Sequence, residues 1–432
     1  MKTFFAAALA GSVSAAAADH WAVLVAGSNT YGNYRHQADV AHAYTILTSQ
    51  GYLPENIIYM AYDDIANNRE NPFPGQLFNR TNGPNVYDAS VVDYKGTDVT
   101  AEKFLAVLTG DSATAGGKVL QSNENSNVFV YYTDHGAPNL VAFPSGGYLY
   151  ADKLQAAFET MKTNKMFNEL TFYMEACESG SMFPDLTSNG KIYGVTASNA
   201  TQSSWASYCG SEAVVNGKNI GSCLGDLFST NWMEDTDSAI TAMAMDSESL
   251  TTQYNNVKTK TTRSPVLKFG DFSFMDQGIG EFEGVLSDTS DELWVQRLMK
   301  KMPAIFSTGE ESNSSQHVNQ RDHMLHYLYN KVVTEGGDEN HAALMNEIAL
   351  RSYYDNLFSE VFPGLQEEDL ETKLTDYDCY RFLIDSFEND CGKFSEYGFK
   401  YAKYLSHTCT VGDPEMIGDT AQKIQNICLG LI

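Results

Sequence analysis

With 432 residues, the chain is long enough for two or three domains, and its 43% hydrophobic and 12% aromatic content can fill a sizeable core. The formal net charge of −27 excludes binding surfaces for nucleic acid or anionic membranes, because both require clustered Lys and Arg. Acid would neutralise much of this charge, which fits a protein of the lysosome or vacuole.

The first 18 residues are predicted to be a signal peptide. Lys2 precedes an apolar run at 4–10, and small residues fill 11–18. We therefore expect the protein in the secretory pathway, either in a lysosome or vacuole or secreted. No later stretch reaches about 18 consecutive apolar residues, so no membrane span is expected. Secretion would make three Asn-x-Ser/Thr sequons usable for glycosylation, at Asn79, Asn199 and Asn313.

Residues 19–273 alternate between apolar strand patterns and amphipathic helix patterns. Alternation of this kind predicts an α/β domain with a mostly parallel sheet covered by helices on both faces. A long insertion rich in Asn, Gly and Pro interrupts it at 67–98. The expected strands lie at 21–26, 57–61, 128–133, 170–174 and 192–197, and the expected helices at 36–50, 101–109 and 151–161.

Two of these strands end in residues that could perform chemistry. The strand at 128–133 runs into His135 and Gly136, and the strand at 170–174 leads to Cys177. Open α/β folds place their sites at the carboxyl ends of parallel strands. Either residue alone would more often be structural. Together they predict a thiol nucleophile with a neighbouring imidazole base, the same logic as the caspase pattern.

Several short motifs resemble the legumains, which are asparaginyl endopeptidases and cysteine proteases with a caspase-like fold. The motifs are EACESGSM at 175–182, YTDHG at 132–136, VAGSN at 25–29, NYRHQAD at 33–39, YDDIA at 62–66 and NWMED at 231–235. The resemblance covers almost the whole chain after residue 20, is dense from 21 to about 237, and is thin from there to 320. It implies a caspase-like catalytic domain over 19–273.

The resemblance assigns chemical roles to the residues at these strand ends. Cys177 would attack the scissile carbonyl and form a thioester, and His135 would protonate the leaving amine and then activate water. The backbone N–H groups of Cys177 and Gly136 would form the oxyanion hole. Asn33 matches the third catalytic position of the family, beside the cysteine and the histidine, and would orient the imidazole.

The substrate pocket is also implied by the family match. An Asn side chain offers one accepting oxygen and one donating nitrogen, so a selective pocket needs a donor beside an acceptor. Arg35 would donate to the oxygen and Asp226 would accept from the nitrogen. A substrate Asp would be repelled by Asp226 unless low pH protonates it. His36, Glu175, Ser203 and Ser204 would complete the pocket.

A connector is expected at 274–320 and an all-helical domain at 321–432. Resemblance identifies the helical domain as the legumain prodomain, which caps the active site as an intramolecular inhibitor until the enzyme cleaves the connector after an asparagine. Asn313 and Asn319 are the expected processing sites, and a glycan on Asn313 would favour Asn319.

The seven cysteines are predicted to form three disulfides and leave one thiol. Four of them lie in the helical domain at spacings unlike a metal site, which leaves three possible pairings. Resemblance to the prodomain favours Cys379–Cys409 and Cys391–Cys428. Cys209 and Cys223 flank a loop rich in Gly and Asn and are expected to pair, as in plant-like relatives. Cys177 then remains free, as a nucleophile must.

The charge of the predicted cap departs from the family, whose prodomain is typically basic. Residues 320–432 contain 9 Lys and Arg against 20 Asp and Glu, a net charge of −11 that leaves −16 for the remainder. Overall attraction between the two parts therefore cannot hold the cap in place. We expect local ion pairs or apolar packing to do so.

The expected partners are peptide and protein substrates, the chain's own prodomain and cystatin-type inhibitors. No cofactor and no metal ion are expected, because the sequence has no phosphate-binding glycine loop and no clustered His and Asp ligands. One alternative is a transpeptidase that resolves the same thioester with an amine, and the catalytic subunit of the GPI-anchor transamidase shares this chemistry. Another is a secreted binding protein or protease inhibitor in which the Cys–His pair is a relic.

Overall fold

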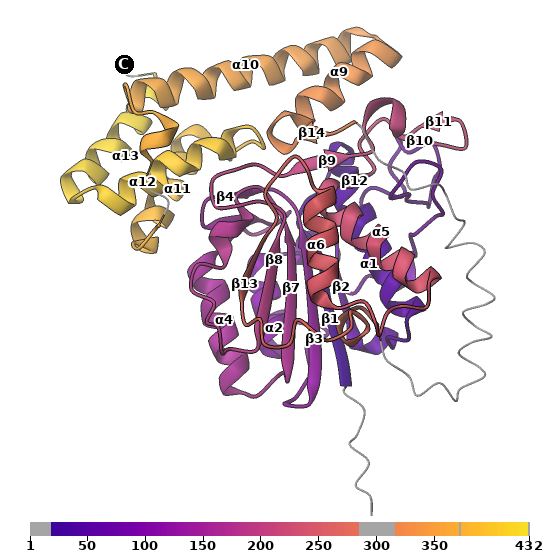
Figure 1. Ribbon diagram of the computed structural model, residues 1–432. Helices are drawn as coiled ribbons and strands as arrows, with labels where there is room; N and C mark the ends of the chain where they lie inside the picture. Colours follow the sequence, from indigo (N-terminus) through magenta and orange to yellow (C-terminus); the bar gives the residue numbers. More distant parts are fainter. Residues whose placement is uncertain (1–18, 285–315, 371–372, 431–432) are drawn as a thin grey trace, which may run out of the picture.

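The computed structural model describes residues 19–284, 316–370 and 373–430 (Figure 1). The predicted signal peptide, the processing and glycosylation candidate Asn313, and most of the predicted connector lie outside these described residues.

A six-stranded sheet forms the centre of the N-terminal part, in the order β13-β8-β7-β3-β1-β2. Its strands are β1 (Asp19–Ala26), β2 (Ile57–Met60), β3 (Ser126–Thr133), β7 (Glu169–Glu175), β8 (Ile192–Thr196) and β13 (Leu267–Gly270). Neighbouring strands are parallel except β13 and β8, which are antiparallel. Every residue of β3 and β7 is buried, as a parallel sheet covered on both faces requires.

Helices cover both faces of this sheet (Figure 1). One layer consists of α1 (Tyr34–Ser49), α5 (Leu227–Thr241), α6 (Leu250–Lys260) and α7 (Gly280–Glu283), and the other of α2 (Ala101–Thr109), α3 (Ser112–Ala115) and α4 (Ala151–Thr163). Alternate residues of β1 point to opposite faces of the sheet. Val23 and Val25 pack in the layer of α2, α3 and α4, and Ala22 and Leu24 pack in the layer of α1, α5, α6 and α7. The predicted α/β class is confirmed.

The N-terminal part extends further along the chain than the predicted boundary at residue 273. Phe274, Ile279 and Phe282 are buried in the same core cluster as α1 and α5. The Tyr52 hydroxyl also donates a hydrogen bond to the Phe282 carbonyl oxygen at 2.8 Å. Residues 274–284 therefore belong to this domain. The glycines and acidic residues of this segment are typical of a linker, but its three apolar side chains, Phe274, Ile279 and Phe282, fill the end of the core.

Three small sheets lie outside the central one. They are β4 (Gly136–Ala137) with β5 (Leu140–Ala142) and β6 (Tyr148–Tyr150), β12 (Gly225–Asp226) with β9 (Trp205–Ser207) and β14 (Val318–Asn319), and the pair β10 (Val214–Val215) and β11 (Lys218–Asn219). The strand β14 lies at the C-terminal end of the predicted connector, so the sheet around β9 attaches that end to the N-terminal part.

The C-terminal part is helical, as predicted, and lies over the carboxyl edge of the central sheet (Figure 1). It contains α9 (His323–Glu335), α10 (Asp338–Val361), α11 (Tyr377–Cys391), α12 (Ala402–Val411) and α13 (Pro414–Cys428). The disulfides Cys379–Cys409 and Cys391–Cys428 join its helices, and Cys209–Cys223 joins the ends of β9 and β12. All three predicted pairings are present. Among the described residues, no helix combines the length and the apolar character that crossing a membrane requires.

Apolar packing joins the two parts. Leu140 and Tyr150 from the N-terminal part are buried in the same cluster as Tyr380 and Phe399 from the C-terminal part. The rings of Tyr150 and Tyr380 meet edge to face with centroids 5.9 Å apart, a favourable aromatic arrangement. A small hydrophobic core shared by the two parts thus helps to hold the C-terminal helices in place.

Candidate active site

The two strand ends that carry the predicted cysteine and histidine lie side by side. The strands β3 and β7 pair in parallel with Thr133 opposite Glu175, so the residues that follow each strand emerge at the same edge. Gly136 packs so tightly that a Cβ atom there would lie 2.3 Å from the Cys177 carbonyl oxygen. Only glycine permits this approach, and it brings the segment that carries His135 against the cysteine backbone.

Cys177 is the one free cysteine among the seven, all of which the structure describes, and it is fully buried. Its sulfur lies 3.7 Å from the Ser204 hydroxyl oxygen. Burial raises the pKa of the Cys177 thiol; the nearby Arg321 opposes the rise and Glu178 adds to it. The closed structure therefore favours the thiol over the reactive thiolate.

The imidazole of His135 is bound to two polar side chains. Its Nε2 atom lies 3.0 Å from Asn33 Oδ1 and 3.2 Å from the carboxylate of Glu396, which precedes α12 in the C-terminal part. Asn33 also donates from Nδ2 to Glu396 at 2.8 Å. Burial alone would raise the pKa of Glu396, but His135, Arg35 and His323 outweigh it and hold that pKa far below its usual value. An ionised carboxylate from the cap thus contacts the candidate base.

The predicted pocket residues form a buried charge cluster. Arg35, in the first turn of α1, donates from Nε to Asp226 Oδ1 at 2.9 Å, and both side chains are fully buried. His36 connects this pair to the histidine strand: its Nε2 lies 3.2 Å from Asp226 and its Nδ1 3.2 Å from Asp134. Burial would raise the pKa of Asp226, but Arg35 and His36 outweigh it, so the carboxylate is ionised.

The other predicted pocket residues adjoin this cluster. Glu175 accepts hydrogen bonds from the backbone N–H of Ser229 at 2.9 Å and from its hydroxyl at 3.0 Å. Burial raises the pKa of Glu175 well above its usual value, and Asp226 adds to the rise. Ser204 is buried near the cysteine, and Ser203 before it is half-buried. The pocket therefore combines the ionised carboxylate of Asp226 with a second buried carboxyl group, Glu175, whose pKa is raised.

A carboxamide of the chain itself bonds to both Arg35 and Asp226, which also contact each other directly. The side-chain oxygen of Gln320 accepts from Arg35 Nη2, and its side-chain nitrogen donates to Asp226. The predicted cleavage residue Asn319 does not enter the pocket, because its side chain caps the next turn and accepts from the Arg321 N–H at 2.9 Å. Sequence reasoning missed Gln320, although a carboxamide next to the predicted cleavage site was a usable signal.

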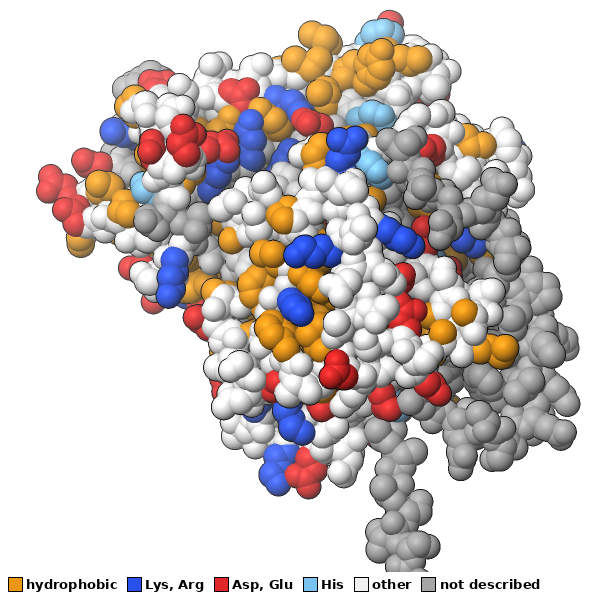
Figure 2. All heavy atoms as spheres, viewed as in Figure 1, with side chains coloured by type: hydrophobic (Ala, Val, Ile, Leu, Met, Phe, Trp, Pro, Cys, Tyr) orange, Lys and Arg blue, Asp and Glu red, His pale blue; other side chains and the backbone are white. Residues whose placement is uncertain are grey.

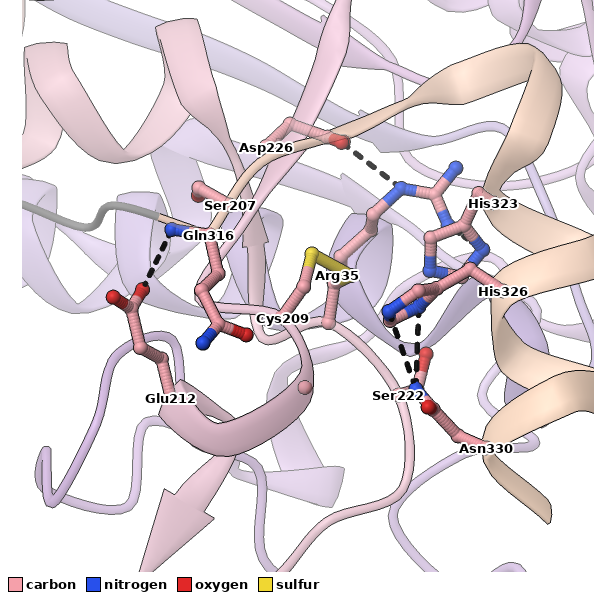
Figure 3. Close-up of a disulfide and its surroundings, with 12 residues drawn as sticks. Arg35, Ser207, Cys209, Glu212, Ser222, Asp226, Gln316, His323, His326 and Asn330 are labelled. Carbon is pink, nitrogen blue, oxygen red and sulfur yellow. Dashed lines mark hydrogen bonds and ion pairs between the residues drawn. A yellow bond between two sulfur atoms is a disulfide. The ribbon is translucent and has the colours of Figure 1, made fainter. Parts of the chain in front are cut away.

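Two further residues of the cap contact the site. The Nη2 atom of Arg321 donates to Glu178 and to the Gly136 carbonyl oxygen, each at 2.6 Å. His323, at the start of α9, places Nδ1 3.1 Å from Arg35 Nη1. Figure 3 shows its ring against the Arg35 guanidinium, with Asp226 on the other side. Nothing in the local sequence pattern distinguishes these residues from ordinary helix-end residues.

Outside the site, ion pairs also hold the two parts together. Lys331 lies 2.8 Å from Glu70, and Arg381 lies 3.0 Å from Asp152. Acidic and basic side chains are intermingled over the C-terminal helices on the face shown in Figure 2. The cap is thus attached by local pairs and apolar packing, as the net charges of the two parts predict.

The structure argues against one of the predicted glycosylation sites. Asn79 is buried, and its side-chain nitrogen donates to Asp39 at 2.6 Å and to the Leu224 carbonyl oxygen at 3.1 Å. A glycan on that nitrogen has no room in this fold, so the sequon at Asn79 is corrected to a structural residue. Asn199 lies in a half-buried loop, and its side chain contacts Gln202.

A buried free thiol and a buried imidazole on adjacent strand ends, with a pocket that holds a carboxamide of the same chain, form the arrangement of a latent cysteine peptidase. The fold and the site define that class.

Comparison with known proteins identifies the family. The model of the peptidase C13 family matches residues 20–285, and the model of the legumain prodomain matches residues 345–428. The chain belongs to the peptidase C13 family. It is therefore a cysteine-type endopeptidase, a hydrolase, with a legumain prodomain.

Relatives match over most of the chain. The δ-isozyme of vacuolar-processing enzyme from Arabidopsis thaliana is 37% identical over 434 residues, covering 94% of this chain and 90% of its own. Vacuolar-processing enzyme from Vicia sativa is 36% identical over 422 residues, covering 91% and 83%. Hemoglobinase from Schistosoma mansoni is 39% identical over 381 residues, covering 86% and 82%. Among solved structures, caspase-1 from Spodoptera frugiperda is 9% identical, with a TM-score of 0.36 over 59% of this chain and 86% of that one.

Proposed function

We propose that the enzyme hydrolyses peptide bonds after asparagine. The supporting observation is the Gln320 carboxamide, whose oxygen faces Arg35 and whose nitrogen faces Asp226. Asparagine carries the same group on a side chain one methylene shorter. An aspartate substrate would place a second acceptor against Asp226 and would enter only when acid protonates it. A pocket built on such polar pairs rejects a mismatched group strongly.

The reaction would proceed through a thioester on Cys177. The thiolate attacks the carbonyl carbon after the asparagine, and the backbone N–H groups of Cys177 and Gly136 stabilise the oxyanion. His135 donates a proton to the leaving amine and then removes one from the water that hydrolyses the thioester. Asn33 would hold the imidazole in position, as its 3.0 Å contact with His135 supports.

The full chain would be a zymogen that activates itself. The cap blocks the pocket with Gln320 and ties the imidazole to Glu396, so cleavage at Asn313 or Asn319 must follow release of this segment. Two of the relatives are named vacuolar-processing enzymes. A vacuole or lysosome would supply the acid for release, after entry through the signal peptide at 1–18. Asn199 and Asn313 remain proposed glycan sites, and cystatin-type proteins remain proposed inhibitors.

The test uses the purified full chain, held at pH 4–5 and at pH 7. Mass spectrometry follows its C-terminal fragment, and matched fluorogenic peptides with Asn, Asp or Gln before the cleaved bond measure specificity. We expect acid-dependent cleavage at Asn313 or Asn319 and turnover of the Asn peptide. Cys177→Ala serves as the inactive control. Absence of turnover after acid treatment and after limited proteolysis of the connector would refute the proposal. Adding an amine-bearing peptide to the same assay separates hydrolysis from transpeptidation.

A further inference from the structure

Residues 318 and 319 pair with a strand edge in the manner of a bound peptide, and the chain then enters a 3-10 turn at Gln320–Asp322. The strand β14 pairs antiparallel with β9, placing Val318 opposite Ala206 and Asn319 opposite Trp205. The Gln320 N–H then donates to the Ser204 carbonyl oxygen at 3.2 Å, and its side chain fills the pocket. Extended pairing with a strand edge and alternate side chains in pockets is a common mode of peptide recognition. The residue after the pocket-bound side chain is Arg321.

The groups that bind Arg321 belong mainly to the catalytic domain. Its Nη2 atom donates to the Glu178 carboxylate and the Gly136 carbonyl oxygen, and its Nη1 atom donates to the Glu396 carbonyl oxygen at 3.2 Å. When the cap leaves, Glu396 leaves with it, but Glu178 and Gly136 stay beside Cys177. The free enzyme therefore retains a carboxylate and a carbonyl oxygen positioned for a cation.

The backbone fixes the direction of Glu178. This residue follows the cysteine directly, has a left-handed φ of 49° and donates its N–H to the Gln202 carbonyl oxygen at 2.9 Å. Its side chain is 6% exposed. A cavity of about 310 Å³ adjoins it in the capped enzyme, with Pro138, Ala200 and Thr201 on the catalytic side and cap residues, among them Glu367 and Lys403, on the other. The site thus has a fixed charge beside a space that opens further when the cap leaves.

We propose that Glu178 and the Gly136 carbonyl oxygen form a subsite for a basic residue immediately after the cleaved bond. This proposal rests on the proposed function and specifies its substrate class: peptides in which Asn is followed by Arg or Lys. Such a residue would reproduce the contacts of Arg321, and charge-assisted hydrogen bonds of this kind are the strong ones. Glu178 is thus a specificity residue on the leaving-group side.

The preference should depend on pH, because only ionised Glu178 attracts a cation. Burial raises the pKa of Glu178, Arg321 and Lys403 lower it, and Glu367 raises it; the thiol of Cys177 is also close. Arg321, Lys403 and Glu367 all depart with the cap. Protonation at low pH would then remove the charge, so the preference for a basic residue should be largest at the upper end of the active pH range.

The experiment compares three quenched peptides with Asn before the cleaved bond and Arg, citrulline or Ala after it, using the full chain after its own acid activation. Citrulline has the shape of Arg without the charge. We expect kcat/KM to be about tenfold higher for Arg than for citrulline near pH 6, the size of one charge-assisted hydrogen bond. The ratio should fall toward one as the pH is lowered.

Variants test the assignment through the same ratio, which cancels any loss of folded enzyme. Glu178→Gln should bring the ratio close to one, and Glu178→Lys should invert the preference in favour of an acidic residue. Asp185→Asn, which removes an exposed carboxylate elsewhere, should leave the ratio unchanged. Cleavage after Asn with equal rates for Arg and citrulline in the unmodified enzyme would overturn the subsite alone. Failure to cleave any Asn peptide would instead overturn the proposed function, and the subsite with it.

Discussion

Replacing His323 with asparagine isolates the contribution of one buried contact to acid release. In the capped enzyme the imidazole lies 3.1 Å from Arg35 and is fully buried. A neutral imidazole can accept a hydrogen bond from the guanidinium, whereas a protonated one places two cations in contact. The His323→Asn variant keeps an accepting oxygen at this position but cannot take up a proton.

The size of the effect follows from the pKa of His323. Burial and Arg35 hold that pKa well below its ordinary value of 6.5, and Glu396 and Asp226 only partly offset them; His326 adds to the depression. The capped state therefore binds no proton here, while a released His323 does. The contribution of His323 to the stability of the cap is fully present above pH 6.5 and is lost as the pH falls below it, by up to about tenfold in the capped-to-released ratio per pH unit.

The depressed pKa of Glu396 contributes in a different window. The stability that ionised Glu396 gives to the cap is lost only as the pH falls below the ordinary carboxyl pKa. Glu396 therefore adds little to the pH dependence of cap stability between pH 6.5 and about 4.5. We therefore expect His323→Asn to move the midpoint of self-processing to lower pH by about one unit or more. The midpoint is measured by mass after fixed incubation times.

Two controls make this result decisive. His341→Asn changes an exposed histidine on α10 and should leave the midpoint unmoved. In a Cys177→Ala background, where processing cannot occur, the melting temperature should fall less between pH 7 and 5 when His323 is asparagine. An unchanged midpoint together with an unchanged pH dependence of melting would refute the reasoning.

Four further substitutions have defined expected outcomes. Asp226→Ala should lower kcat/KM for Asn peptides by about 100-fold or more, because Arg35 loses its buried partner and the substrate amide its acceptor; an unchanged preference for Asn over Asp would contradict the pocket. Gln320→Asn should place the preferred side chain in the pocket and produce a new cleavage after residue 320, detected by mass. Arg321→Ala leaves Glu178 buried and unpaired, at a cost of about 3–5 kcal/mol, so activity at pH 7 should rise. Removing Arg381, which is 25% exposed, should cost less than about 1 kcal/mol and leave latency intact.

The sequence could indicate His135 and Cys177 as candidates because the signal that marks them is local. A buried parallel strand is apolar throughout, so the first polar residues after it mark the edge of the sheet. That pattern located His135 and Cys177, and the parallel register of β3 and β7 brings them together. The pocket residues Arg35 and Asp226 are far apart in the chain, and only the family resemblance linked them. Their 2.9 Å contact agrees with it.

The cap contacts could not be predicted in this way. Glu396 reaches His135 across more than 250 residues, and no local pattern distinguishes it from the many other acidic residues of the C-terminal part. The sequon at Asn79 failed for a related reason, because a three-residue motif carries no information on burial. The core residue Phe282 lies in a segment whose glycines and acids resemble a linker, so its packing showed only in three dimensions.

The charge distribution indicates where the pH dependence must reside. Both parts are acidic, with net charges of −11 and −16, so protonating surface carboxylates weakens their mutual repulsion and on that account favours the capped state. Acid release therefore requires buried groups that oppose this trend, and the His323–Arg35 contact is one. Surface charges are screened within about 8 Å at physiological ionic strength, whereas a buried pair is screened much less. Raising the salt concentration should reduce the surface repulsion but leave the contribution of His323 intact. The shift in processing midpoint caused by His323→Asn should accordingly be the same at low and high salt, and a shift that disappears in high salt would place the switch on the surface instead.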